Sequence, residues 1–237
     1  MSEKLSRWIY DKVKEAKGEG CVIGLSGGID SVVASILCKM AFPETTLGII
    51  MPCHSHPGDE EDALLGAEKF QFPTLTIDLK DIFNSFVELL ISADPNVEAK
   101  GLSTVNMKPR LRMITLYHFA AKYNRLVIGT GNKSEITIGY FTKYGDGGVD
   151  LLPLGNLVKH QVYELARYLD VPDKLIQKPP TAGLWEGQTD ENEMGMGYND
   201  LDHFILTGEG RPEIVDKITN MNARSEHKRR RPPIPEF

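Results

Sequence analysis

The chain has 237 residues, of which 41% are hydrophobic and 25% are charged, so it can bury one full core and is predicted to form a single domain over residues 1–237. Its net charge of −6 argues against nucleic-acid binding, which needs a basic surface over many phosphates. No apolar run could cross a bilayer and the polar N-terminus is not a secretion signal, so we expect no membrane association. The three cysteines are an odd number and are not spaced like those of a disulfide framework, which favours a reducing, cytoplasmic location.

Strand and helix patterns alternate through the first half of the chain. A helix is predicted over residues 5–17, and a short apolar run at 21–23 predicts the first buried strand. Further apolar runs predict strands at 47–51, 74–78 and 125–128, separated by helices at 59–70, 81–91 and 105–123. Helices at 157–169, 191–206 and 212–224 follow. This alternation predicts an α/β fold, a doubly wound parallel sheet with helices on both faces.

The loop after the first strand has the composition of a phosphate-binding turn. Its glycines allow the backbone to approach a ligand closely, and the first N–H groups of the following helix point at an anion placed there. It is not a Walker A motif, because Ile29 and Asp30 stand where that motif has glycine and lysine, and it lacks the G-x-G-x-x-G dinucleotide pattern. The residues of the predicted loop are Gly24, Leu25, Ser26, Gly27, Gly28, Ile29, Asp30 and Ser31.

Asp30 sets the electrostatics of this loop. A carboxylate beside phosphates is repelled unless a divalent cation bridges them, so Asp30 indicates magnesium. A structural alternative is an ordinary strand-to-helix turn, in which an acid is favourable at the helix N-terminus. The fourth predicted strand ends at residues 129–135, and in open α/β sheets this strand end belongs to the same ligand site as the first loop.

Two other features have ordinary structural explanations. The loop from 52 to 59 contains one cysteine and two histidines, but no further soft ligand follows at a usual spacing. We therefore expect a mobile lid there rather than a metal site. Arg110 and Arg112 interrupt the apolar pattern of their helix, and we expect both on a solvated face.

Two groups of motifs resemble known families. Ser-Gly-Gly-Ile-Asp-Ser at 26–31 resembles the pyrophosphate loop of the N-type ATP pyrophosphatases, which adenylate a substrate and release pyrophosphate. The block Gly-Tyr-Phe-Thr-Lys-Tyr-Gly-Asp-Gly-Gly-Val-Asp at 139–150 looks like ammonia-dependent NAD synthetase, as does the segment from Lys-Pro-Pro-Thr at 178–181 to Thr-Asp-Glu at 189–191. The resemblance covers nearly the whole chain. It implies an adenine nucleotide alpha hydrolase-like, Rossmann-like fold.

The resemblance implies a two-step ligase reaction that forms a C–N bond. The nicotinate carboxylate of deamido-NAD attacks the α-phosphate of ATP and pyrophosphate leaves, after which ammonia displaces AMP to give NAD. ATP and deamido-NAD are then the substrates, and Mg²⁺ is the cofactor. Residues matching family positions are Gly24 to Ser31, Thr130, Lys159 and Thr181 for ATP, Asp30 and Glu135 for magnesium, and Arg110, Lys143, Asp150, His227 and Lys228 for deamido-NAD.

The family also implies a homodimer with deamido-NAD at its interface. A glutaminase domain would need a few hundred more residues, so free ammonia is the expected nitrogen donor. Gly183 departs from members that carry an aspartate there, so no ammonia-handling role is assigned at that position. Alternatives are another N-type pyrophosphatase, such as a GMP synthetase-like or tRNA-thiolating enzyme, or a non-catalytic adenine-nucleotide sensor. The basic tail at 227–231, taken alone, would indicate a disordered tail or a weak nucleic-acid patch.

Overall fold

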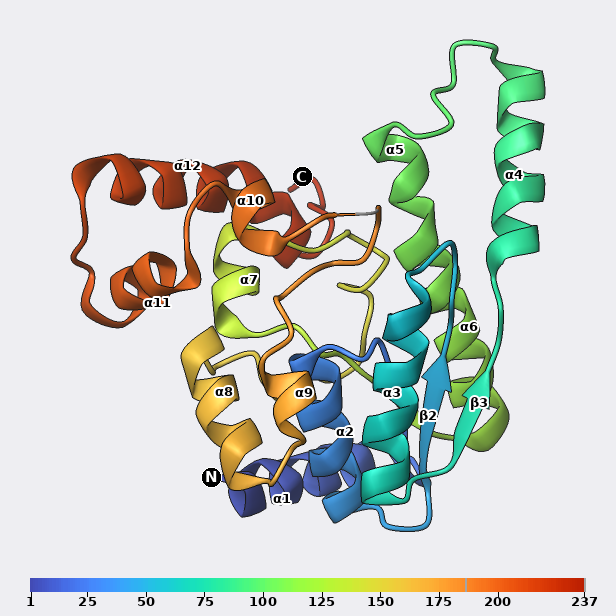
Figure 1. Cartoon of the computed structure of the whole chain (residues 1–237), viewed down its shortest axis with the longest axis vertical. Coiled ribbons are helices and arrows are strands. Elements are labelled where there is room, and N and C mark those ends of the chain that lie inside the picture. Colours follow the sequence, from blue (N-terminus) through green and yellow to red (C-terminus); the bar gives the residue numbers. More distant parts are fainter. Residues whose placement is uncertain (186, 237) are drawn as a thin grey trace.

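The computed structural model describes residues 1–185 and 187–236 and confirms the predicted doubly wound α/β fold (Figure 1). Its strands are β1 (Cys21–Gly24), β2 (Thr46–Ile50), β3 (Thr74–Thr76) and β4 (Leu126–Ile128). All pair in parallel in the order β3-β2-β1-β4, with Val22 of β1 opposite Leu47 on one side and Val127 on the other. The four strands lie where the apolar runs predict them.

Helices occupy the rest of the architecture. They are α1 (Ser2–Glu15), α2 (Ile29–Ala41), α3 (Pro57–Phe70), α4 (Lys80–Ala93), α5 (Leu102–Val105), α6 (Met107–Tyr123), α7 (Lys133–Ile138), α8 (Lys159–Tyr168), α9 (Asp173–Ile176), α10 (Asp190–Met194), α11 (Tyr198–Thr207) and α12 (Pro212–Arg229). Helices α10 to α12 lie together beside α7, at the upper left of Figure 1, while α4 stands at the opposite side. No helix among residues 1–185 and 187–236 is long and apolar enough to cross a membrane.

The alternating side chains of β1 divide the core into two layers. Cys21 and Ile23 point into a cluster with α1, α2, α3 and α8, whereas Val22 points into a second cluster with α4 and α6. All three side chains are fully buried, and burying an apolar side chain of this size contributes roughly 1.5–3 kcal/mol. A strand covered on both faces must be apolar throughout, which is why β1 has no polar residue before its terminal glycine.

The strand order fixes where a ligand can bind. The chain runs outward from β1 through β2 to β3 and then returns, so that β4 lies on the other side of β1. The carboxyl ends of β1 and β4 therefore form the point at which the strand order reverses. The predicted phosphate loop follows β1, and the segment from Gly129 to Glu135 follows β4. The sheet brings them together as the crevice rule predicts.

Several predicted helix bounds are wrong, each for a local reason. The helix predicted over 191–206 is two helices, because Gly195 ends α10 in the left-handed conformation at φ +62°. Helix α3 begins at Pro57 rather than residue 59, because proline suits the first turn and the His56 ring accepts from the Gly58 N–H. Helix α7 was not predicted as a helix. The basic tail is helical as far as Arg229, so the disordered-tail alternative fails there.

Gly139 ends α7 where α12 packs against it. Its φ is +69°, and a Cβ there would lie 2.1 Å from the Cβ of Ser225. We expect Gly139→Ala to lower the free energy of unfolding by about 2–4 kcal/mol, from left-handed strain plus overpacking. Gly208→Ala is the matched control, because Gly208 also has positive φ but no atom within 4 Å of the added Cβ. Urea unfolding of both variants checks this, and equal losses would show that the α7–α12 contact is not tight.

Candidate active site

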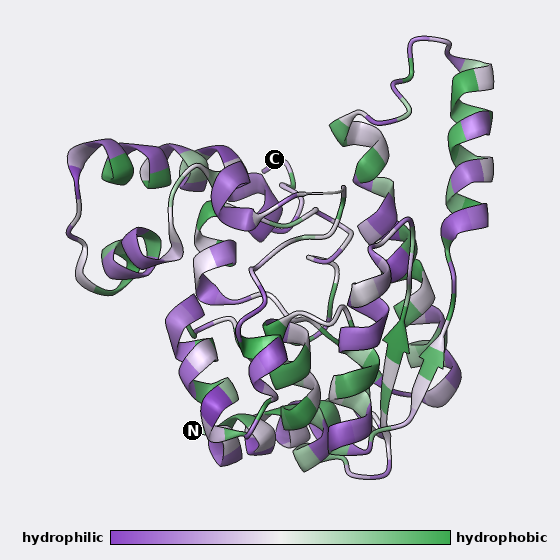
Figure 2. Cartoon of the chain, in the orientation of Figure 1, coloured by the Kyte–Doolittle hydropathy of each residue, from purple (hydrophilic) through white to green (hydrophobic). Residues whose placement is uncertain are grey.

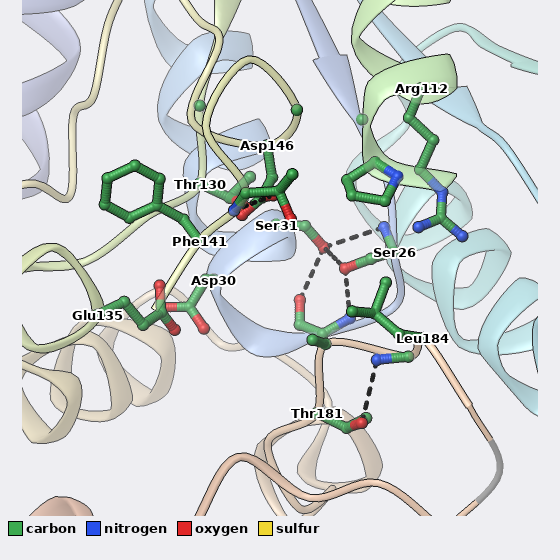
Figure 3. A pocket seen from close by; sticks show the side chains of 18 of the residues that line it. Ser26, Asp30, Ser31, Arg112, Thr130, Glu135, Phe141, Asp146, Thr181 and Leu184 are labelled. Carbon is green, nitrogen blue, oxygen red and sulfur yellow. Dashed lines mark hydrogen bonds between the residues drawn. The ribbon is translucent and has the colours of Figure 1, made fainter. Parts of the chain in front are cut away.

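A cavity of ≈ 400 Å³ lies at the carboxyl ends of β1 and β4 (Figure 3). The cavity is lined by the β1 loop, by the segment after β4 and by the segment Lys178–Leu184. We call this segment the strap. Of the predicted site residues, those that line the cavity are Gly24, Leu25, Ser26, Gly28, Ile29, Asp30, Ser31, Thr130, Glu135, Lys159, Thr181 and Lys228.

The β1 loop is braced by its own hydroxyl groups. Ser31 Oγ donates to the Gly28 carbonyl oxygen at 2.8 Å, while Ser26 Oγ accepts from the Gly28 N–H at 3.2 Å. Gly27 has φ +74°, and any Cβ there would lie 2.6 Å from the Asp59 carbonyl oxygen of α3. The loop leads into α2 with no side chain capping its first turn. The first N–H groups of this 13-residue helix have no side-chain cap, and such an uncapped helix start suits an anion.

Three charged side chains meet beside this loop. Lys159 at the start of α8 is almost fully buried, and its Nζ contacts Asp30 and lies 3.6 Å from Glu135 Oε1. Burial, reinforced by the negative charge of Asp30, raises the pKa of Glu135 to about 8. Burial would lower the pKa of Lys159, but the two carboxylates outweigh it and the pKa rises. One lysine therefore does not neutralise the two acids.

Backbone capping holds Glu135 in place. Asn132 is fully buried and caps α7: its Oδ1 accepts from the Glu135 N–H at 3.1 Å, and Glu135 Oε2 accepts from the Asn132 N–H at 3.2 Å. Asn132 Nδ2 also donates to Asp30 Oδ1 at 3.0 Å. The sequence analysis missed this residue, although Asn-x-x-Glu before a helix is the signal of a capping box. Asn132 orients both acidic side chains at once.

A second layer of polar residues lies behind these acids. Tyr198 OH donates to Asp190 Oδ2 at 2.9 Å, and Tyr140 OH donates to Glu193 Oε2 at 2.7 Å. Asp190 and Glu193 line the cavity, and burial raises the pKa of Asp190. Tyr140 and Asp190 belong to the quoted motifs, but sequence reasoning assigned no role to any of the four. They come from the segment after α7, from α10 and from α11, and only the tertiary fold brings them together.

The donor set beside the loop suits Mg²⁺. Among the described residues no group of three or more histidine, cysteine or acidic side chains forms a closed metal site. Mg²⁺ does not need one, because it binds through one or two carboxylates together with substrate phosphates and water. Asp30 and Glu135 supply two carboxylates that a single lysine leaves under-neutralised. The residues present therefore fit the predicted ion.

The five predicted deamido-NAD residues fall into three groups. Arg110, Lys143 and His227 form a surface cluster outside the cavity, in which Lys143 Nζ donates to the His227 carbonyl oxygen at 2.7 Å. Lys228 lines the cavity and donates to the carbonyl oxygens of Gly139 and Phe141 at 2.7 Å each. Asp150 lies apart from both, accepting from Tyr117 OH at 2.9 Å and from the Val127 N–H at 2.8 Å.

Two surface predictions need correction. Arg112 does not lie on a solvated face: it lines the cavity, and its Nε donates to the Met51 carbonyl oxygen at 3.1 Å (Figure 3). The loop from 52 to 59 is not a free polar loop, because Cys53 is fully buried and Ser55 Oγ accepts from Arg112 at 3.3 Å. Buried Cys53 has its pKa raised by burial, so a reactive or ligating thiolate is disfavoured.

The strap is tied to α3 at its first residue. Lys178 Nζ contacts Asp59 Oδ1 and Asp62 Oδ2, each at 2.8 Å. Further along, Thr181 Oγ1 accepts from the Gly183 N–H at 3.1 Å, and Gly183 has φ +61°, a conformation that suits glycine. These bonds place the strap opposite Ser26 across the cavity (Figure 3).

Similarity to known proteins identifies the family of this chain. The NAD synthase family model matches residues 1–232. The chain belongs to the NAD synthase family. It is 54% identical to an NH(3)-dependent NAD(+) synthetase of Carboxydothermus hydrogenoformans over 99% of this chain and 96% of that protein. Among solved structures, the chain is similar to an NMN synthetase from Francisella tularensis, with a TM-score of 0.92 and 42% identity over 100% of this chain and 97% of that one. It is also similar to an NH3-dependent NAD synthetase from Campylobacter jejuni, with a TM-score of 0.80 and 33% identity over 99% of this chain and 97% of that one.

The raised pKa of Glu135 makes a prediction about stability. A native pKa above the unfolded value means that the native state keeps its proton longer, so stability is lost as pH rises from about 4.5 to about 8. In metal-free buffer, the unfolding free energy of the wild type relative to Glu135→Gln should therefore fall across this range. Denaturant titrations at several pH values check this, with exposed Glu68→Gln as control. A difference independent of pH would mean that the pKa of Glu135 is the same in the native and unfolded states.

Proposed function

We propose that this NAD synthase family member makes NAD from deamido-NAD, with ATP as the activating substrate and ammonia as the nitrogen donor. The observation that carries the proposal is the pairing of an anion-binding helix start with two under-neutralised carboxylates, Asp30 and Glu135, at one end of the sheet. Simple nucleotide binding does not need such a pair. Displacement at a phosphate needs such a pair, because negative charge grows on the departing pyrophosphate.

Each step of the reaction has a supporting group. The nicotinate carboxylate attacks the α-phosphorus of ATP, and the bond from that phosphorus to pyrophosphate breaks. The β1 loop and the first turn of α2 bind the departing pyrophosphate, and Lys159 supplies a fixed positive charge beside it. Ammonia then attacks the acyl carbon, and AMP leaves. The protein acts by positioning and charge stabilisation rather than by a covalent intermediate of its own.

Asp30 and Glu135 would hold Mg²⁺, which supplies positive charge to the phosphate oxygens when bound. Thr130 and Thr181 offer hydroxyl donors from opposite sides of the cavity, which suits a nucleotide lying across it (Figure 3). Lys228 adds a cation on the cavity wall, while Arg110, Lys143 and His227 extend basic and polar groups toward the surface. A long dinucleotide running from the cavity to this surface cluster would use both.

A homodimer is part of the proposal. Helix α4 exposes Ile82, Phe86 and Leu89, which are spaced four and three residues apart and therefore lie on one face. Figure 2 shows apolar residues along α4 where this helix stands away from the sheet. Leu102 and Ile114 add exposed apolar side chains on α5 and α6. Exposed apolar side chains of this kind suit an interface between copies.

A second candidate substrate follows from one observation. The chain is 42% identical, over its full length, to a protein described as an NMN synthetase. Nicotinic acid mononucleotide carries the same carboxylate as deamido-NAD, so the same two steps would amidate it to NMN. The two candidates differ only in whether the site needs the adenylate half of the dinucleotide. Competition between the two acids at equal concentration decides between them.

The function is tested with ATP, Mg²⁺, ammonium and deamido-NAD, scored for NAD and for AMP against ADP. Under these conditions Asp30→Asn should fold normally but lower kcat roughly 100-fold or more, the scale seen when one charge-stabilising group is lost. The charge is removed, whereas the size of the side chain is kept. Asp173→Asn on α9, away from the cavity, is the control. ADP as product, or near-normal turnover by Asp30→Asn at ordinary magnesium, would contradict the assignment.

The dimer is tested by adding charge to α4. Leu89 is 66% exposed, so Leu89→Glu should leave the fold of one subunit intact and convert dimers to monomers at micromolar concentration. Light scattering gives the molar mass directly. Tyr168→Glu is the matched control, because Tyr168 is 76% exposed on α8 and lies outside this face. A wild-type protein that is monomeric at these concentrations removes the dimer from the proposal.

A further inference from the structure

Lys108, in the first turn of α6, is a charged side chain for which the chemistry above has no use. It is only 5% exposed, its Nζ donates to the Leu184 carbonyl oxygen at 2.6 Å, and Nζ lies 5.7 Å from the centre of the Phe83 ring. Among the described residues no carboxylate pairs with it. Burial lowers the pKa of Lys108, so holding the ammonium there costs free energy. The hydrogen bond to the Leu184 carbonyl oxygen offsets part of the cost of burying this ammonium group.

Leu184 is the residue through which the strap is held. Its carbonyl accepts from Lys108, and its N–H donates to Gln188 Oε1 at 2.8 Å. Gln188 Nε2 in turn donates to Glu193 Oε2 at 2.6 Å, the same carboxylate that accepts from Tyr140. A continuous set of bonds therefore runs from α6, through the strap, to the acidic wall of the cavity.

We propose that Lys108 is a positioning residue, which holds the strap over the nucleotide cavity through the Leu184 carbonyl. This inference rests on the proposed use of ATP. Without Lys108, the buried Leu184 carbonyl has no other donor among the described residues, and an unsatisfied buried acceptor is costly. The strap would move outward to reach water. Thr181 and Leu184, which line the cavity, would move with it.

Strap position can be measured without any reaction. The chain has two tryptophans, and Trp185 directly follows the strap at 43% exposure. In a Trp8→Phe background, the emission of Trp185 reports on this segment alone. Lys108→Met keeps the length and apolar stem of the side chain but removes the donor. Its constant for acrylamide quenching, without substrates, should rise up to about twofold as Trp185 becomes more exposed.

The catalytic consequence is a split between KM and kcat. Lys108→Met should raise KM for ATP roughly tenfold, the scale of one lost charge-assisted hydrogen bond, while kcat at saturating ATP changes less than about twofold. Lys122→Met, on the exposed face of the same helix, is the matched control and should change neither value. An unchanged quenching constant, or an unchanged KM for ATP, overturns the proposal.

A second variant and one further outcome complete the test. If Lys108→Met does not fold, Lys108→Gln replaces it: its donor lies one atom closer to the backbone, so it loses reach to Leu184 while staying polar. It should show the same rise in quenching, and wild-type quenching would overturn the proposal. If neither wild type nor variant makes NAD or NMN yet quenching rises, the proposed function fails while the positioning role of Lys108 stands.

Discussion

Three helices begin at one point beside the sheet, and the charges gathered there organise the rest of the site. Asp30 lies in the first turn of α2, Glu135 in the first turn of α7, and Lys159 is the first residue of α8. Helix N-termini favour negative groups, so two acids are well placed there, whereas a lysine is not. Lys159 is tolerated because both carboxylates surround it. The result is a compact charged centre in which one lysine faces two acids.

The strand order is what makes this convergence possible. Because β4 returns to the far side of β1, the loops after these two strands face each other across the reversal point. Asn132 then links them by bonding to Asp30 while it caps α7. The capping box, an element of helix stability, thereby also sets the distance between two acidic side chains. Stability and chemistry use the same hydrogen bonds here.

The two segments that flank the cavity differ in how they are held. The segment before α3 is fixed by a buried cysteine and by Arg112, so it belongs to the wall. The strap instead is held by polar contacts, from Lys178 and Lys108 at its two ends and from the Asp190 N–H to the Pro180 carbonyl oxygen between them. Polar contacts exchange with water more readily than buried apolar ones, so the strap is the better candidate for opening during the reaction.

The sequence by itself determined the fold class, the four strands and the glycine-rich turn between β1 and α2, because these depend on apolar periodicity and on glycines at a strand-to-helix turn. It also singled out Asp30, Glu135 and Lys159. The family resemblance pointed to all three, and the loop pointed to Asp30 because a carboxylate beside phosphates needs a bridging cation. Tertiary structure alone decided the roles of Asp190, Tyr198, Arg112 and Lys108, since each comes from a helix whose local pattern reads as ordinary. A charged residue on a helix is usually solvated, and only packing shows when it faces a cavity or is buried beneath a strap. Local sequence carries propensity, whereas the meeting of distant side chains depends on the order of the strands and on the packing of helices around them.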